Sequence, residues 1–172
     1  MDTKHVLDFF YKRRSIRRYK DANVSPEAID TILRAAMSAP SAGNEQPWHF
    51  IVVDDRQKMK EITKFHPYSS MLNTAPKCII VVADVDLQRY RGYWVQDCAA
   101  ATQNMLLAIA QLGLGGVWLG VHPIKEREEG IRRLFNLPDH IIPFAIVALG
   151  VPDEEKGPSD RYKPERVHMN TW

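Results

Sequence analysis

Cysteine is scarce in this sequence, with only two among 172 residues. Cys78 and Cys98 lie far apart in apolar stretches, and no CxxC motif or Cys/His ligand spacing is present. This pattern excludes a disulfide framework and a zinc-finger type of metal site. Both thiols are predicted to be small buried side chains. Because such cysteine usage is typical of a reducing compartment, we expect a cytoplasmic protein.

Long hydrophobic runs and a large charge of one sign are also missing. Residues 1–8 lack the apolar core of a signal peptide, and polar side chains interrupt the most apolar stretch, residues 93–112. The formal net charge of +2 is small for a nucleic-acid-binding protein. We therefore expect neither a membrane protein nor a nucleic-acid partner.

Conventional catalytic motifs are absent as well. The sequence contains no GxSxG elbow and no GxGxxG motif after a predicted strand. The six histidines are scattered without metal-ligand spacing, at His5, His49, His66, His122, His140 and His168. We expect no metal site, and the side chains alone indicate no nucleophilic catalysis.

The length and the hydrophobic content of 45% fit one globular domain spanning residues 1–172. Apolar spacing predicts helices at residues 3–13, 25–40, 56–65, 93–112 and 125–135. It predicts strands at 48–53, 78–83 and 144–149, with a further short apolar segment at 117–121. Because helices and strands do not alternate strictly, we expect an α+β fold with helices packed around a sheet.

Two of these predicted helices carry further information. Ser25, Pro26 and Glu27 form a helix start, with a hydroxyl cap, a proline in the first turn and an acid near the helix dipole. The helix at 93–112 is nearly apolar all round, so it must be covered on every side, and we expect a partner subunit to supply part of the cover. Residues 113–116 are predicted to stop this helix, although glycines there would also let a flat ring approach the backbone.

The segment Arg13-Arg14-Ser15-Ile16-Arg17-Arg18 is the most informative part of the sequence. Arginine presents a planar, permanently charged fork of donors that suits phosphate oxygens. A solvated helix end or a nucleic-acid patch would have the same composition. The segment therefore predicts a phosphate site only in combination with other features.

The loop at residues 40–46 is rich in small and amide side chains. Exposed backbone groups together with Asn44 and Gln46 could hydrogen-bond the edge of a planar heterocycle. Taken alone, the loop is better interpreted as a surface turn.

These fragments occur together, and in this order, in one protein family. RRSIRRY, then SAPSAGNEQPWHF, then a QDCAAA helix ending in GLGGVWLG, closely resemble the FMN-dependent nitroreductase family. The tail RYKPERVH and the terminal NTW are similar to the end of that family. The resemblance covers about residues 12–172 and implies a central, mostly antiparallel sheet surrounded by helices in a domain-swapped homodimer.

The resemblance also implies a cofactor site. FMN would be bound through its phosphate, ribityl chain and pyrimidine by Arg13, Arg14, Ser15 and Arg17, with Arg17 as the partner of N1 and O2 of the ring. Pro40, Ser41, Ala42 and Asn44 would line the flavin from the other subunit. Leu119 and Gly120 would lie beside the ring near N5, and Arg161 and Lys163 would reach the phosphate.

The activity implied by the resemblance is NAD(P)H-dependent reduction of nitroaromatic, quinone or similar small-molecule acceptors by ping-pong hydride transfer. A flavin sensor or store without turnover and a reductive dehalogenase-like enzyme remain alternatives. This chain is short between Asp84 and Tyr93, where longer members carry a helical lid. Tyr90, Tyr93 and Trp94 could cover the flavin in part, or could instead pack in the core.

Overall fold

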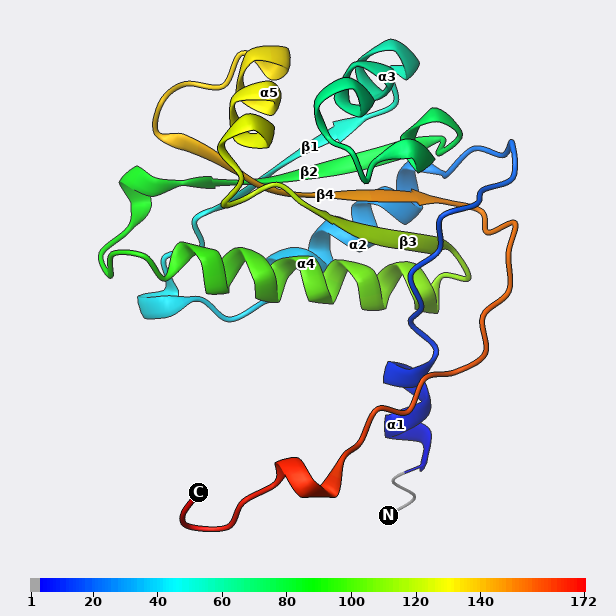
Figure 1. Cartoon of the computed structure of the whole chain (residues 1–172), viewed down its shortest axis with the longest axis vertical. Coiled ribbons are helices and arrows are strands. Elements are labelled where there is room, and N and C mark those ends of the chain that lie inside the picture. Colours follow the sequence, from blue (N-terminus) through cyan, green and yellow to red (C-terminus); the bar gives the residue numbers. More distant parts are fainter. Residues whose placement is uncertain (1–3) are drawn as a thin grey trace.

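One antiparallel sheet forms the centre of the protein (Figure 1). The structure is a computed structural model that describes residues 4–172. The strands pair in the order β1-β2-β4-β3, and they are β1 Trp48–Val53, β2 Lys77–Asp84, β3 Gly115–Gly120 and β4 Ile141–Gly150. The expected α+β fold is confirmed, and every pairing in this sheet is antiparallel.

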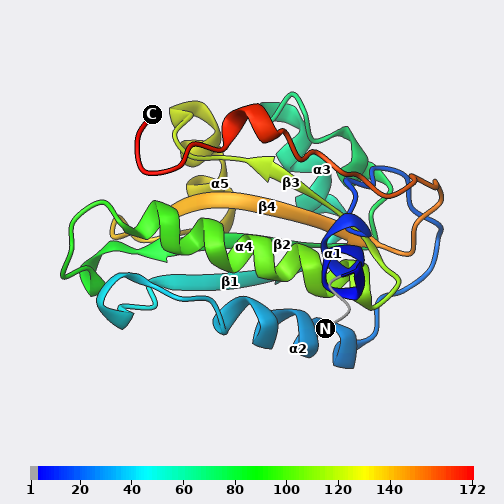
Figure 2. The same ribbon diagram turned by 90° about the horizontal axis from the view of Figure 1, so that it is seen from below.

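Two layers of helices cover the two faces of the sheet (Figures 1 and 2). On one face lie α2 Pro26–Met37 and α4 Trp94–Gln111, and on the other lie α3 Arg56–Phe65 and α5 Lys125–Phe135. The continuous apolar sequence of β2 explains this arrangement, because Ile79 and Val81 belong to one core and Cys78 and Ile80 to the other. The predicted helices and strands are confirmed, with ends that differ by a few residues.

The predicted start of α2 is confirmed in detail. The side-chain oxygen of Ser25 accepts a hydrogen bond from the backbone N–H of Ala28 at 3.2 Å, and Pro26 lies in the first turn. An unsatisfied N–H of the first turn thereby gains a partner, which stabilises the helix by about 1 kcal/mol.

The interpretation of residues 113–116 as a helix stop was only half right. Gly113, with φ of 73°, follows the end of α4, whereas Gly115 and Gly116 already belong to β3. A Cβ atom on Gly115 would lie 2.6 Å from Cγ2 of Ile16. The glycine is therefore needed because the Ile16 side chain of the arginine-rich segment packs against β3 at this point.

The helix α4 is covered less completely than its composition predicts. Its buried residues face the sheet and α2, while Gln96, Gln103 and Gln111 are exposed along the opposite side. Half-buried alanines flank these glutamines. Among the described residues no helix is both long and apolar enough to cross a membrane.

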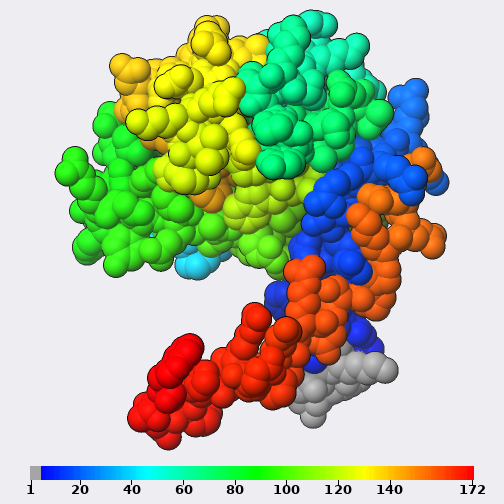
Figure 3. Space-filling view, viewed as in Figure 1, coloured from blue at the N-terminus to red at the C-terminus, as the bar shows by residue number. Residues whose placement is uncertain are grey.

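The two ends of the chain form arms that project from the body (Figures 1 and 3). The N-terminal helix α1, Lys4–Tyr11, ends before the predicted Arg13, and its predicted start at Thr3 lies outside the described residues. Its apolar side chains are exposed rather than buried, with Val6 57% and Phe10 49% accessible. The tail, residues 151–172, runs beside α1, where the N–H of Ser159 donates to the carbonyl of Tyr11 at 3.3 Å.

Candidate functional site

The arginine-rich segment runs along the sheet beside β3. The N–H of Ile16 donates to the carbonyl of Gly116 at 3.0 Å, and a β-bridge joins Ser15 to Gly116. Ile16 and Tyr19 are buried, and the hydroxyl of Tyr19 donates to the carbonyl of Ile16 at 2.6 Å. Because these apolar residues anchor the segment, the basic residues between and before them keep fixed positions.

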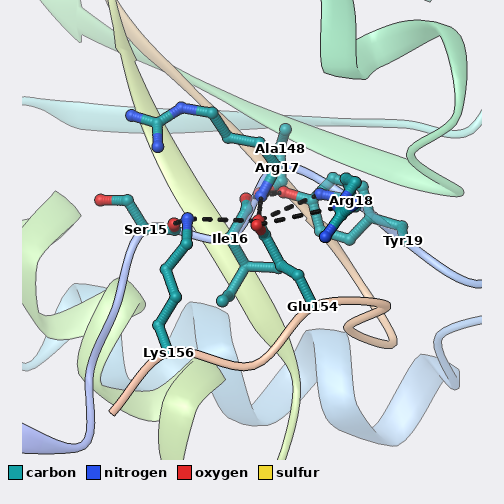
Figure 4. Close-up of polar contacts among 8 residues, drawn as sticks. All are labelled: Ser15, Ile16, Arg17, Arg18, Tyr19, Ala148, Glu154 and Lys156. Atoms are coloured by element: carbon teal, nitrogen blue, oxygen red, sulfur yellow. Dashed lines mark hydrogen bonds and ion pairs between the residues drawn. The ribbon is translucent and has the colours of Figure 1, made fainter. Parts of the chain in front are cut away.

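The tail fastens this segment through Glu154 and Lys156 (Figure 4). Oε1 of Glu154 accepts the backbone N–H groups of Arg17 at 2.5 Å and Arg18 at 3.3 Å, while Nζ of Lys156 donates to the carbonyl of Ser15 at 2.6 Å. The N–H of Arg17 is the main reason that the pKa of Glu154 is held below its usual value, and Lys156 adds to the effect. The charged side chain of Glu154 therefore fixes the backbone of Arg17 and Arg18.

Arg13 and Arg161 line one cavity of about 330 Å³, together with Tyr11, Ser159 and Asp160. Burial lowers the pKa of Arg13, and the neighbouring charges of Arg161 and Arg14 lower it further. Two guanidinium groups that line one cavity have donors that suit a doubly charged anion, although the carboxylate of Asp160 lines the same cavity. Lys163, also predicted at the phosphate, is exposed two residues beyond Arg161.

Arg17 lines a second cavity, of about 510 Å³, with Leu119 and Gly120. A Cβ atom on Gly120 would meet nothing within 4 Å, so the strand leaves open space there. The carbonyl of Gly120 accepts hydrogen bonds from Nε2 of His66 at 2.9 Å and Nη1 of Arg127 at 2.8 Å. The structure therefore brings these three predicted residues together on an open, flat part of the backbone.

His66 is buried beneath this cavity, at 1% accessibility. Burial lowers its pKa, while the bond to the Gly120 carbonyl acts in the opposite direction. Because a carbonyl can only accept, Nε2 carries a proton, and the lowered pKa favours the neutral imidazole. His66 thus orients the backbone at Gly120 without adding charge to the cavity.

Arg14 and Ser15 are placed apart from these two cavities. Arg14 lines a smaller cavity of about 180 Å³ beside α4 and donates to the carbonyl of Gly157. Ser15 is half-buried on the β3 edge, where its carbonyl is bonded to Lys156. Their predicted contacts with the cofactor remain predictions.

The loop at residues 40–46 adopts an unusual backbone conformation. Gly43, Asn44 and Gln46 have φ values of 53°, 57° and 49°, in the left-handed region. Left-handed non-glycine residues carry strain that surrounding contacts must hold in place. Here the hydroxyl of Ser41 accepts the N–H of Gln46 at 3.0 Å, and the carboxylate of Asp97 accepts the N–H of Ala42 at 3.0 Å.

The amides of this loop are partly used within it. Nε2 of Gln46 donates to Oδ1 of Asn44 at 2.9 Å, so the Asn44 carbonyl already has a partner. The Nδ2 group of Asn44, which is exposed, keeps its donors for a ligand. Pro40 is exposed and Ser41 and Ala42 are half-buried on the same loop.

Arg89 and Tyr90, in the segment between β2 and α4, lie against this loop. Oε1 of Glu45 accepts the N–H groups of Arg89 and Tyr90, both at 2.6 Å, and the ring of Tyr90 stands 2.5 Å from where a Cβ atom of Gly43 would be. Tyr90 is 55% exposed, whereas Trp94 is buried in the core against Phe144. Of the three aromatic residues considered as a cover, Tyr90 is thus placed on the loop and Trp94 is a core residue.

Two buried carboxylate oxygens stand without a partner near this contact. They are Oε2 of Glu45 and Oδ2 of Asp97. Burial raises the pKa of Asp97, and the charge of Glu45 raises it further. Asp97 thus holds the loop to α4, and Glu45 holds residues 89–90 to the loop.

Comparison with known proteins assigns the chain to a family. The model of the Nitroreductase family matches residues 11–67 and 63–151. A Methanothermobacter thermautotrophicus protein, provisionally named NADH dehydrogenase/NAD(P)H nitroreductase, is 52% identical over 97% of this chain and 87% of its own length. The chain belongs to the nitroreductase family.

Solved structures of this family superpose closely on the chain. A Clostridium acetobutylicum protein, provisionally named NADH oxidase, has a TM-score of 0.93 at 44% identity, covering 96% of this chain and all of that one. A provisionally named nitroreductase from Desulfovibrio desulfuricans, in complex with FMN, has a TM-score of 0.84 at 33% identity, covering 97% of each chain. The resemblance found in the sequence is confirmed.

In this nitroreductase-family chain the predicted site residues fall at two ends of α4. Asp97 in the first turn holds the loop at 40–46, whereas the cavity of Arg14 is lined by Leu106 and Ile109 near the other end. The helix has 18 residues and spans roughly 27 Å. One chain therefore does not bring the loop next to the arginines.

Several residues around the site carried no clear signal in the sequence. Glu154 and Lys156 lie in a tail without periodicity, and His66 and Arg127 lie on separate elements that meet only after folding. Glu45 and Asp97, which lie inside the motifs SAPSAGNEQPWHF and QDCAAA, could have been found from their positions.

Proposed function

We propose that the protein is an FMN-dependent oxidoreductase that uses NAD(P)H to reduce nitroaromatic, quinone or similar small-molecule acceptors. The observation that carries the proposal is the course of residues 13–17 along β3, which supplies a cationic cavity at Arg13 and an open, flat cavity at Arg17. Family membership adds the chemistry that such a pair of cavities serves. FMN would supply the hydride transfer, so the chain needs no nucleophile or acid–base pair.

The residues fit this cofactor on physical grounds. The phosphate of FMN carries up to two negative charges, which would offset the repulsion that lowers the pKa of Arg13 beside Arg161. Arg17 would stabilise negative charge that develops on the pyrimidine side of the ring. The open backbone at Gly120 would admit the ring, while His66 and Arg127 fix the carbonyl of that residue.

We further propose that the working form is a homodimer in which the loop at 40–46 of one copy completes the site of the other. Three features support the proposal: the separation of the two ends of α4, the glutamine and alanine face of that helix, and the exposed apolar residues of α1. In a two-fold symmetric pair, each surface contributes twice and both sites are completed together.

Reductant and acceptor are expected to occupy the same cavity in turn. No side chain projects from Gly120 into this space, and the ring of Tyr68 lies at its rim with Arg127 5.5 Å from the ring centroid. Alternate occupation predicts ping-pong kinetics with parallel double-reciprocal lines. The expected cytoplasmic location agrees with a supply of NAD(P)H.

Anaerobic reduction tests the proposed activity against flavin storage. The purified, yellow protein should lose its absorbance near 450 nm when NADH or NADPH is added under argon, and should regain it when a nitroaromatic compound is supplied. A yellow protein that NAD(P)H does not bleach would be a flavin store, and a colourless protein that does not take up FMN would refute the cofactor assignment.

A further inference from the structure

Three chemistry-bearing side chains converge at one corner of the sheet, away from the arginine cavities. They are Asp84 at the end of β2, Asp86 in the following 3-10 turn Val85–Leu87, and His140 just before β4. One potential ligand atom from each lies within 4.8 Å of the other two. The residues come from three different elements, so their spacing in the sequence does not reveal the cluster.

A second histidine borders this cluster from β1. Nε2 of His49 lies 3.9 Å from Oδ2 of Asp84. His49 pairs with Val82, two residues before Asp84 on β2, so alternation along the strand places both side chains on the same face. The cluster thus offers two imidazoles and two carboxylates.

The backbone around the cluster is fixed by hydrogen bonds. The N–H of Asp84 donates to the carbonyl of Pro47 at 2.8 Å, and the N–H of Val85 donates to the carbonyl of His140 at 3.0 Å. Oδ1 of Asp84 accepts the N–H of Asp86 at 2.9 Å. Three elements are therefore held together before any ligand arrives.

The two carboxylates have no lysine or arginine partner in the described part of the chain. Within residues 4–172, no lysine or arginine forms an ion pair with Asp84 or Asp86, and the ion-pair partner of Asp84 is His49. Two neighbouring carboxylates and two imidazole rings supply oxygen and nitrogen atoms that can bind a metal, and this set favours a bound cation over a bound anion.

We propose that His49, Asp84, Asp86 and His140 bind one divalent transition-metal ion of the zinc class. Mixed nitrogen and oxygen ligands suit Zn²⁺ or Co²⁺, whereas Mg²⁺ and Ca²⁺ prefer oxygen alone. Bond lengths of about 2.0–2.2 Å bring ligand atoms to roughly 3.3 Å from one another, and rotation of the exposed Asp86 side chain closes the remaining gap. The ion would clamp the start of β1 and the end of β2 to the start of β4.

Metal titration of the tag-free, FMN-loaded protein tests this proposal. After chelator treatment and dialysis, calorimetry with Zn²⁺ should give one ion per chain, and Co²⁺ should give visible absorption bands of a four-coordinate site. At about 100-fold excess over Kd the melting temperature should rise by roughly 5–10 °C. Because the experiment measures metal binding and melting temperature and not turnover, its result does not depend on the proposed activity.

Matched variants decide which residues hold the ion. His140→Ala and Asp84→Asn should each abolish this binding, and His49→Ala should weaken it at least tenfold. Asp139→Asn, whose side chain is fully exposed next to His140, should bind as the wild type does. Should the variants at the half-buried Asp84 and His140 unfold, Asp86→Asn at an exposed position still tests the cluster. Absence of Zn²⁺ binding in the wild type, or equal binding in wild type and Asp86→Asn, would overturn the proposal.

Discussion

The two ends of α4 use different physical means to prepare a binding surface. At the C-terminal end, charged side chains lie in the cavities, and Glu154 in the tail fixes their backbone. At the N-terminal end, the loop at 40–46 holds a strained backbone against buried carboxylates of Glu45 and Asp97. The C-terminal end of α4 is thus suited to bind a charged group, and the N-terminal end supplies a fixed backbone shape and backbone donors.

The largest effect is expected from removing charge at the arginine end. Each charge-assisted hydrogen bond contributes about 1.5–3 kcal/mol, so the double variant Arg13→Ala/Arg17→Ala should weaken FMN binding by about 100-fold or more. Quenching of FMN fluorescence measures the affinity. Arg34→Ala is the matched control, because Arg34 pairs with Asp30 on the exposed face of α2. Similar affinities for the two variants would remove the arginines from the site.

At the loop end, Gly43→Val should also weaken FMN binding, although it changes the conformation of the loop and removes no charge. A β-branched residue at φ of 53° is strained by about 1–3 kcal/mol, and its side chain would collide with the ring of Tyr90. FMN affinity should fall about tenfold or more, while far-UV circular dichroism stays unchanged. Adding Tyr90→Ala removes only the collision, so affinity should return in part.

Mixing these two variants tests whether the ends meet across a dimer. If one copy supplies the loop and the other the arginines, each mixed dimer has one intact and one doubly damaged site. Random exchange should then restore about one quarter of the wild-type sites, at an FMN concentration that leaves each variant alone empty. No restoration after exchange would mean that the site lies within a single chain.

A smaller effect is expected at Glu154, which positions the arginines without lying at the phosphate. Glu154→Gln keeps an acceptor for the N–H of Arg17 but loses the charge that Lys156 shares, so FMN affinity should fall about tenfold. The pKa of Glu154 is lowered from 4.5, so its contribution to stability is present above pH 4.5 and is lost as the pH falls through the lowered pKa. Between pH 4.5 and the lowered pKa, the melting temperature of Glu154→Gln should therefore change less with pH than the melting temperature of Glu155→Gln does.

Much of the fold follows from local pattern. The apolar run of β2 requires cover on both faces, and the Ser25-Pro26 start of α2 needs no distant contact. The exposed face of α1 did not follow, because an amphipathic pattern indicates that a face is to be covered but not by which chain. Gly115 and Gly116 were interpreted as part of a helix stop although they begin β3, because the contact of Gly115 with Ile16 forms only when distant segments pack together.

The candidate site was predicted less completely than the fold. Its arginines and loop were singled out by their residue types and the resemblance assigned their roles, but neither source gives the direction in which each side chain points. Arg13, Arg14 and Arg17 lie in three different cavities. The partners that hold them, Glu154 above all, act through backbone groups that leave no pattern in the sequence.

The smallest effect is expected at Asp97, and it has the opposite sign to the changes at the arginine end. Because burial and Glu45 raise its pKa, the contribution of this carboxyl to stability is lost as the pH rises from 3.8 through the raised pKa. Asp97→Asn keeps an acceptor for the N–H of Ala42 and stays neutral, so it should melt a few degrees higher than the wild type at pH 7, by an excess that vanishes below pH 4. Asp139→Asn, at a fully exposed side chain, should show no such excess. A lower melting temperature for Asp97→Asn at pH 7 would mean that the loop end, like the arginine end, depends on charge, since the carboxylate would then stabilise the first turn of α4.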